Sequence, residues 1–120
     1  MTAIQTFTSF TTSNCYVVTP ENNSDVCYII DLPPDVEPAL EYVKNNNLSI
    51  GGCLLTHGHF DHIGDLFAAI DINKEAKIVT SLEVSSWLNA KGISNTLPMG
   101  IGGSQPLDND IKVVMVNAVH

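Results

Sequence analysis

The sequence predicts an α/β fold in which a mixed sheet carries flanking helices. Short apolar runs rich in β-branched residues recur along the chain, and stretches with helical spacing separate the later runs. Strands that alternate with helices favour a layered arrangement. The chain has 120 residues, of which 44% are hydrophobic. This content suits one domain with its own core and excludes an intrinsically disordered segment.

The first third of the chain is predicted to form strands. Residues 4–10 alternate apolar with polar side chains, and residues 14–19 and 26–31 are short runs rich in β-branched and aromatic residues. The segment between them, 20–25, consists of residues that favour turns. We therefore expect a hairpin and an antiparallel start to the sheet.

A helix is predicted after the two prolines at 33–34. Asp35 is the expected N-cap, because its side chain can accept hydrogen bonds from the first helical N–H groups. The three asparagines at 45–47 end the helix. Its predicted apolar face, spaced i, i+4 and i+7, consists of Val36, Leu40 and Val43.

A fully apolar strand at 53–56 is followed by a second predicted helix at 65–73. The residues expected on the buried side of this helix are Leu66, Phe67 and Ile70.

Residues 77–80 are predicted as another strand, followed by a helix. Thr80 and Glu83 have the spacing of a capping box at its start, and Gly92 is a natural stop at its end. Residues 93–104, with Pro98 and three glycines, are predicted to be a loop, and residues 111–119 are predicted to be a final strand. The apolar stripe of the helix consists of Val84, Trp87 and Leu88.

Composition narrows the functional classes. Five Lys and Arg against 13 Asp and Glu give a net charge of −8, which repels polyanions and argues against nucleic acid as a partner. Cys15, Cys27 and Cys53 lie in apolar strand-like runs, so we expect buried, reduced thiols and a cytoplasmic setting. No basic leader and no apolar stretch of ~20 residues occurs, so neither a signal peptide nor a membrane span is expected.

The main functional signal is the cluster of His57, His59, Asp61 and His62. Imidazole nitrogens and carboxylate oxygens are the ligands of zinc, iron and manganese. The cluster lies between a strand end and a helix start, where ligands gather in α/β folds. His57 and His59 could share one metal, and the adjacent Asp61 and His62 suit a second. The alternative is a surface loop that holds three histidines by chance.

The segment Thr56–Gly64, THGHFDHIG, resembles the His-x-His-x-Asp-His signature of the metallo-β-lactamase-fold superfamily. The segments NCYVV at 14–18 and YIID at 28–31 look like the start of glyoxalase II-like members. The resemblance implies the amino-terminal half of an αββα sandwich, with residues 1–120 as a single truncated or half domain. Later segments similar to metal-dependent hydrolases akin to the ascorbate-phosphate lactonases are 92–93, 99–103 and 116–120.

The same resemblance implies a role for each site residue. Asp61 is also the candidate catalytic group, orienting or deprotonating a water molecule when it is not a ligand. Asp31 would support the site from behind the ligands, and zinc, as one or two ions, is the implied cofactor, with iron and manganese as alternatives. The family's bridging aspartate and later histidine have no counterpart in this sequence, so weak or absent occupancy of the second site is expected. The implied ligands are His57, His59 and His120 for the first metal, and Asp61 and His62 for the second.

The leading interpretation is a metal-dependent hydrolase of a small-molecule ester, lactone, thioester or phosphoester. One alternative is a non-catalytic metal-binding half-domain that forms a homo-oligomer or is completed by another chain. Another is an interaction module with a vestigial loop. Trp87 and Tyr42 are candidates for a pocket wall, although aromatic residues in an apolar stripe usually pack in the core.

Overall fold

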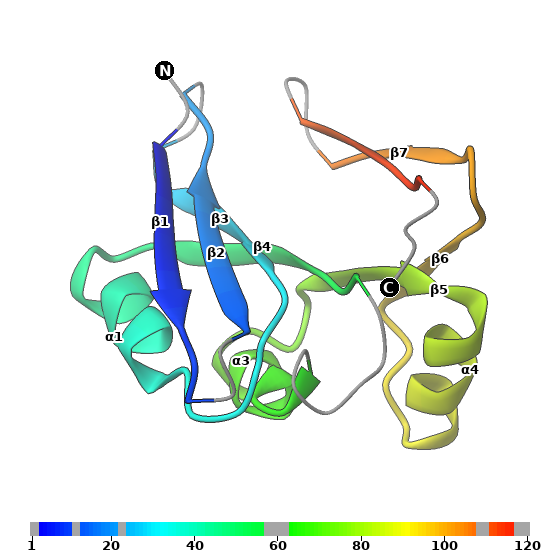
Figure 1. Ribbon diagram of the computed structural model, residues 1–120, viewed down its shortest axis with the longest axis horizontal. Helices are drawn as coiled ribbons and strands as arrows, with labels where there is room; N and C mark the ends of the chain where they lie inside the picture. Colours follow the sequence, from blue (N-terminus) through cyan, green and yellow to red (C-terminus); the bar gives the residue numbers. More distant parts are fainter. Residues whose placement is uncertain (1–2, 11–12, 22–23, 57–62, 108–110, 117–120) are drawn as a thin grey trace.

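The computed structural model describes residues 3–10, 13–21, 24–56, 63–107 and 111–116. Over these residues the chain forms a six-stranded mixed sheet, a separate two-stranded sheet and flanking helices (Figure 1). The predicted α/β class with a mixed sheet is confirmed.

The large sheet begins with antiparallel strands. β1 (Ala3–Thr8), β2 (Asn14–Thr19) and β3 (Val26–Ile30) follow one another along the chain and pair as antiparallel neighbours. In the register of the second pair, Val17 lies opposite Ile29. The predicted hairpin and the antiparallel start are therefore confirmed.

The sheet continues with parallel strands. β4 (Ser49–Leu54), β5 (Lys77–Ser81) and β6 (Thr96–Met99) extend it from β3, in the order β1-β2-β3-β4-β5-β6. The prediction of a loop over 93–104 is wrong for β6. A proline is tolerated at Pro98 because β6 is an edge strand.

The small sheet is a hairpin. β7 (Ser104–Pro106) and β8 (Lys112–Val114) pair as antiparallel strands. Sequence patterning predicted a strand over 111–119, but the described strand ends at Val114. Residues 117–120, including His120, lie outside the described residues.

In the described part of the chain, three helices pack around the large sheet, namely α1 (Glu37–Asn45), α3 (Leu66–Ile72) and α4 (Leu82–Ala90). Figure 1 shows α1 and α3 towards one end of the strands and α4 beside β5 and β6. All three contribute buried residues to one core with the inward side chains of β2, β3, β4 and β5. The predicted stop at Gly92 is confirmed, since its φ of 88° is a conformation that favours glycine.

Two predicted helix caps are wrong. The N-cap of α1 is Val36, not Asp35, because Asp35 adopts a left-handed backbone with φ of 61°. The N-cap of α4 is Ser81, whose Oγ accepts a hydrogen bond from the Val84 N–H at 3.4 Å. Thr80 belongs to β5 and is buried.

The predicted buried side of α3 is correct only in part. Leu66 is fully buried and Ile70 packs against the core, but Phe67 is 41% exposed. The side chain of Phe67 instead meets that of Trp87 edge-on, with ring centroids 6.2 Å apart.

The three thiols are buried and free, as predicted. They belong to the core between the sheet and the helices. Burial raises the pKa of Cys15 to about 12, of Cys27 to about 11 and of Cys53 to about 12. Among the described residues, no helix has the length and apolar character needed to cross a membrane.

The opposite face of the sheet is also apolar but is only partly covered. The segment 113–116 lies over Ile30, Leu54 and Val79, and together they enclose a hollow of about 310 Å³. Within this segment Val116 remains 73% exposed. One face of the sheet is thus closed by helices, whereas the other is left partly open.

Candidate functional site

The carboxyl ends of four strands define one edge of the sheet. β3, β4, β5 and β6 run parallel, so the residues that follow them lie along the same edge. Asp31 follows β3, Thr56 follows β4 at a distance of two residues, and Ser81 ends β5. In parallel α/β sheets this edge is where ligands bind.

The predicted ligand cluster begins one residue after Thr56. Residues 57–62 lie outside the described residues, as does the fifth predicted ligand. Within the described part of the chain, no group of three or more His, Cys, Asp or Glu side chains is placed to hold a metal ion. The ligand roles therefore stay predictions for His57, His59, Asp61, His62 and His120.

Asp31 anchors the residue that precedes the cluster. Its carboxylate is buried, with Oδ1 accepting from the Thr56 N–H at 2.8 Å and Oδ2 accepting from the Thr56 hydroxyl at 2.7 Å. The Asp31 N–H donates to the Leu54 carbonyl oxygen at 2.8 Å, and its φ of 60° turns the chain at the strand end. Charge-assisted bonds of this kind are short and strong. This geometry suits the supporting role predicted for Asp31.

The other end of the cluster is held by Gly64 and Asp65. A Cβ atom on Gly64 would lie 2.7 Å from the backbone nitrogen of Pro34, so only glycine fits without a shift of the backbone. The Asp65 N–H donates to the Leu32 carbonyl oxygen at 2.9 Å. The Asp65 Oδ2 accepts from the Val36 N–H at 2.8 Å. Both flanks of the cluster thus contact the segment between β3 and α1.

We name residues 31–36 the bracket, because this segment contacts both flanks. It is itself fixed to the start of the chain by the Ser9 hydroxyl, which donates to the Pro34 carbonyl oxygen at 2.6 Å. The carboxylate of Asp65 lies at the start of α1, where a negative charge is favoured by the helix dipole. This role of Asp65 is not among those predicted from the sequence. The available signal was an acidic residue directly after a glycine at a helix start, although its partner is 29 residues away.

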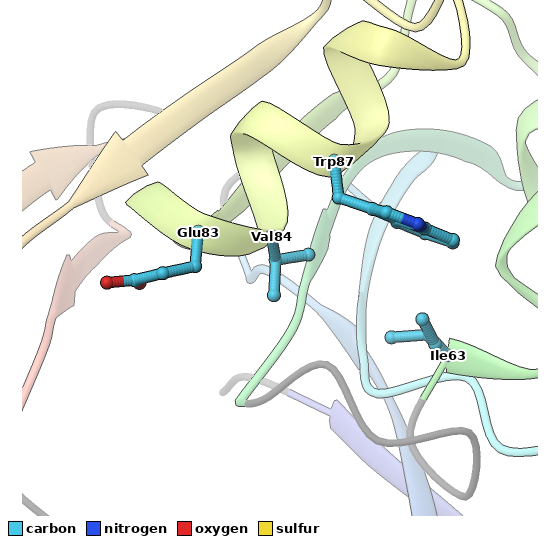
Figure 2. A pocket seen from close by; sticks show the side chains of 4 residues that line it. All are labelled: Ile63, Glu83, Val84 and Trp87. Carbon is cyan, nitrogen blue, oxygen red and sulfur yellow. The ribbon is translucent and has the colours of Figure 1, made fainter.

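The two aromatic candidates for a pocket wall differ. Tyr42 packs against Phe7, with ring centroids 5.8 Å apart. Trp87 is 42% exposed and lines a hollow of about 220 Å³ together with Ile63, Glu83 and Val84 (Figure 2). Trp87 therefore stays a candidate, because Ile63 directly follows the predicted ligand cluster in the sequence.

The family model of the metallo-beta-lactamase superfamily matches residues 8–116. A UPF0173 metal-dependent hydrolase of Koribacter versatilis (strain Ellin345) is 40% identical over 106 residues, which cover 87% of this chain and 42% of that protein. The chain thus spans less than half the length of this relative.

Solved structures share the fold. The BLEG-1 B3 metallo-beta-lactamase is 27% identical with a TM-score of 0.61, over 73% of this chain and 40% of that chain. A protein crystallised in a di-iron-bound form is 19% identical with a TM-score of 0.59, over 84% of this chain and 55% of that chain. The mixed sheet and the family match agree, and the chain belongs to the metallo-beta-lactamase superfamily.

Proposed function

We propose that this chain is the metal-binding part of a metal-dependent hydrolase. The observation that carries the proposal is the HGHFDH sequence at the carboxyl end of β4, in a chain that matches the superfamily over residues 8–116. The relative from Koribacter versatilis is described as a metal-dependent hydrolase, which favours the same class of activity here.

The donor set fits a metal ion of the zinc type. Three imidazoles and a carboxylate within six residues match the ligands of zinc and of iron. The described structure supports this fit, because both flanks of the cluster are tied to the bracket by short hydrogen bonds. We propose His57, His59 and His120 for the first ion, and Asp61 and His62 for a weaker second site. Zinc is our first choice, and iron is the alternative favoured by the di-iron neighbour.

The bound metal and individual residues of the protein would have separate roles in hydrolysis. When bound, the metal supplies Lewis-acid chemistry, which lowers the pKa of water towards neutrality and stabilises negative charge on the substrate oxygen. Asp61, when it is not bound to a second ion, would orient the attacking water and accept its proton. Asp31 would hold Thr56, and through it the start of the cluster, in one position. The substrate we propose is a small ester, lactone, thioester or phosphoester, and the three buried thiols fit a reducing, cytoplasmic location.

The test is metal content together with hydrolysis of 4-nitrophenyl acetate. We expect the wild-type chain to bind at least one zinc ion, and His57→Ala combined with His59→Ala to lose that ion and at least ~100-fold in rate, as expected when metal-site ligation is destroyed. The matched control combines Glu41→Gln with Glu75→Gln, two exposed carboxylates. A chain with a net charge of −8 attracts dications non-specifically. The zinc content of the control variant shows how much of the bound zinc depends on surface carboxylates. A metal-free wild type, or a rate that the histidine variant leaves unchanged, contradicts the proposal.

A second candidate function is a non-catalytic metal-binding module that pairs with a second copy of itself. The observation that favours it is the partly open apolar face, where Val114 is 54% exposed and Val116 73% exposed. Burial of such a patch against another copy would remove apolar surface from water. Light scattering on the metal-loaded chain is expected to give twice the monomer mass. Val116→Ser should shift this mass towards the monomer, and a wild-type monomer at all concentrations rules the candidate out.

A further inference from the structure

A small apolar hollow lies beside the predicted metal cluster, between α4 and the residue that follows the cluster. Ile63, Val84 and Trp87 supply its apolar walls and Glu83 lies at its margin, around a volume of about 220 Å³. Figure 2 shows the side chains of Ile63, Val84 and Trp87 turned towards the same space, with the carboxylate of Glu83 pointing away from Trp87. Among the described residues that line it, the hollow therefore has an apolar interior and one carboxylate, which lies at the periphery.

The indole of Trp87 is held in place although it is 42% exposed. Phe67 meets it edge-on with a centroid distance of 6.2 Å, and the Lys91 ammonium lies 5.0 Å from the ring centroid. Edge-to-face and cation–π contacts of this kind are attractive and favour one orientation of an aromatic ring. A large exposed ring that is fixed by its neighbours is a typical wall of a binding site.

The position of the hollow relates it to the predicted chemistry. Ile63 directly follows His62, the last residue of the predicted metal cluster, in the sequence. On the other side, α4 starts directly after β5, at the ligand-binding edge of the sheet. A ligand group in the hollow would therefore lie next to the end of the metal cluster.

We propose that this hollow is a substrate subsite for an uncharged ring-sized apolar group, such as phenyl or cyclohexyl. The inference rests on the proposed hydrolase function, since it names the part of the substrate that lies next to the reacting bond. A cavity of about 150 Å³ lined by apolar side chains accepts benzene, so about 220 Å³ suits one such ring. The carboxylate of Glu83 disfavours an anionic group at the same place.

Fluorescence tests the subsite without any need for hydrolysis. Trp87 is the only tryptophan of the chain, so emission excited at 295 nm reports on this hollow. Titration of the metal-free wild-type chain with benzyl alcohol is expected to give a saturable change. Ile63→Ala, which removes three wall carbons, should weaken the apparent affinity by about 5- to 20-fold. Val84→Phe should fill the hollow and abolish the response.

Matched variants keep the test specific. Leu82→Ala changes an exposed apolar residue of the same helix that does not line the hollow, and it should leave the titration unchanged. Benzoate should bind more weakly than benzyl alcohol because its charge is repelled by the Glu83 carboxylate. Glu83→Gln removes that carboxylate and should reduce the difference in affinity between the two ligands. Circular dichroism checks that each variant folds. A linear, unsaturable response, or equal responses of the wild type and the Ile63→Ala variant, overturns the subsite.

Hydrolysis assays distinguish failure of the subsite proposal from failure of the hydrolase proposal. With zinc bound, we expect a lower KM for phenyl acetate than for methyl acetate, and a smaller difference in the Ile63→Ala variant. Absence of hydrolysis together with the expected fluorescence pattern contradicts the hydrolase function and leaves the apolar site supported. Hydrolysis of both esters without preference, and without a fluorescence response, overturns the subsite and leaves the hydrolase function supported.

Discussion

The two faces of the six-stranded sheet differ in how completely they are covered. Neighbouring residues of β3 show this directly, since Ile29 is fully buried under the helices while Ile30 points to the opposite face and is only partly buried. The helix-covered face holds the main core, with α1, α3 and α4 packed on it. The other face carries the segment 113–116 and an apolar hollow. The first face thus provides most of the stability, and the second is the surface available for further packing.

The largest expected effect comes from truncating the two isoleucines in turn. Ile29→Ala leaves a cavity in a closed core and should lower the free energy of unfolding by about 3–4 kcal/mol. Ile30→Ala, which removes the same atoms from the partly open face, should cost about half as much or less because water already reaches that side. Urea denaturation of both variants measures the difference. Equal losses would show that the second face is as well packed as the first.

Removal of the Asp31 carboxylate tests the junction between the end of β3 and the predicted metal cluster. Asp31→Ala leaves the Thr56 N–H and hydroxyl without these two acceptors and should lower the free energy of unfolding by about 2–3 kcal/mol. Asp31→Asn retains one acceptor and should cost about half of this. We also expect the zinc affinity to fall about 10- to 100-fold in the alanine variant, measured by competition with a chelator. An unchanged zinc affinity would mean that the anchor does not position the cluster.

Alkaline pH acts on the helix-covered face through its thiols. Their pKa values are raised by burial, to about 12 for Cys53, so these groups stay protonated in the folded state while the unfolded chain ionises. The unfolded state then binds fewer protons than the native state, and stability falls as pH rises from about 9 to about 12. Cys53 alone should contribute a loss of ~1.4 kcal/mol per pH unit in this range.

Urea midpoints at pH 8, 9 and 10 measure this loss. Cys53→Ala supplies the comparison, because its own stability should fall less steeply with pH than that of the wild type. Identical slopes for the two chains would contradict burial of the Cys53 thiol.

The elements that the sequence predicts well are those with local causes. Apolar runs identify β2 and β3 at their observed bounds or within one residue, and Gly92 marks the end of α4. The misplaced caps have distant causes, since the Val36 N–H is satisfied by Asp65, a residue 29 positions away. β6 was missed because a short edge strand with a proline becomes recognisable only when β5 lies beside it.

The candidate site also combines features with local causes and features with distant causes. The ligand cluster and Asp31 are visible in the sequence because their residue types and strand-end positions are local features. The bracket is not visible, because it depends on backbone groups of Leu32 and Pro34 meeting Gly64 and Asp65 across the fold. Likewise, the spacing of apolar residues along α4 does not reveal that Trp87 contacts Phe67 and Lys91 at the protein surface.

The bracket also has a consequence for the entropy of metal capture. Because one short segment holds both Thr56 and Asp65, folding alone fixes the separation of these two residues. For the metal site proposed above, the entropic cost of bringing Thr56 and Asp65 to this separation is then met by the fold before an ion binds. It follows that residues 56–65 and the bracket should act together as one transferable unit. Transfer of residues 56–65 to another βα connection should reproduce metal binding only when residues 31–36 are transferred with them.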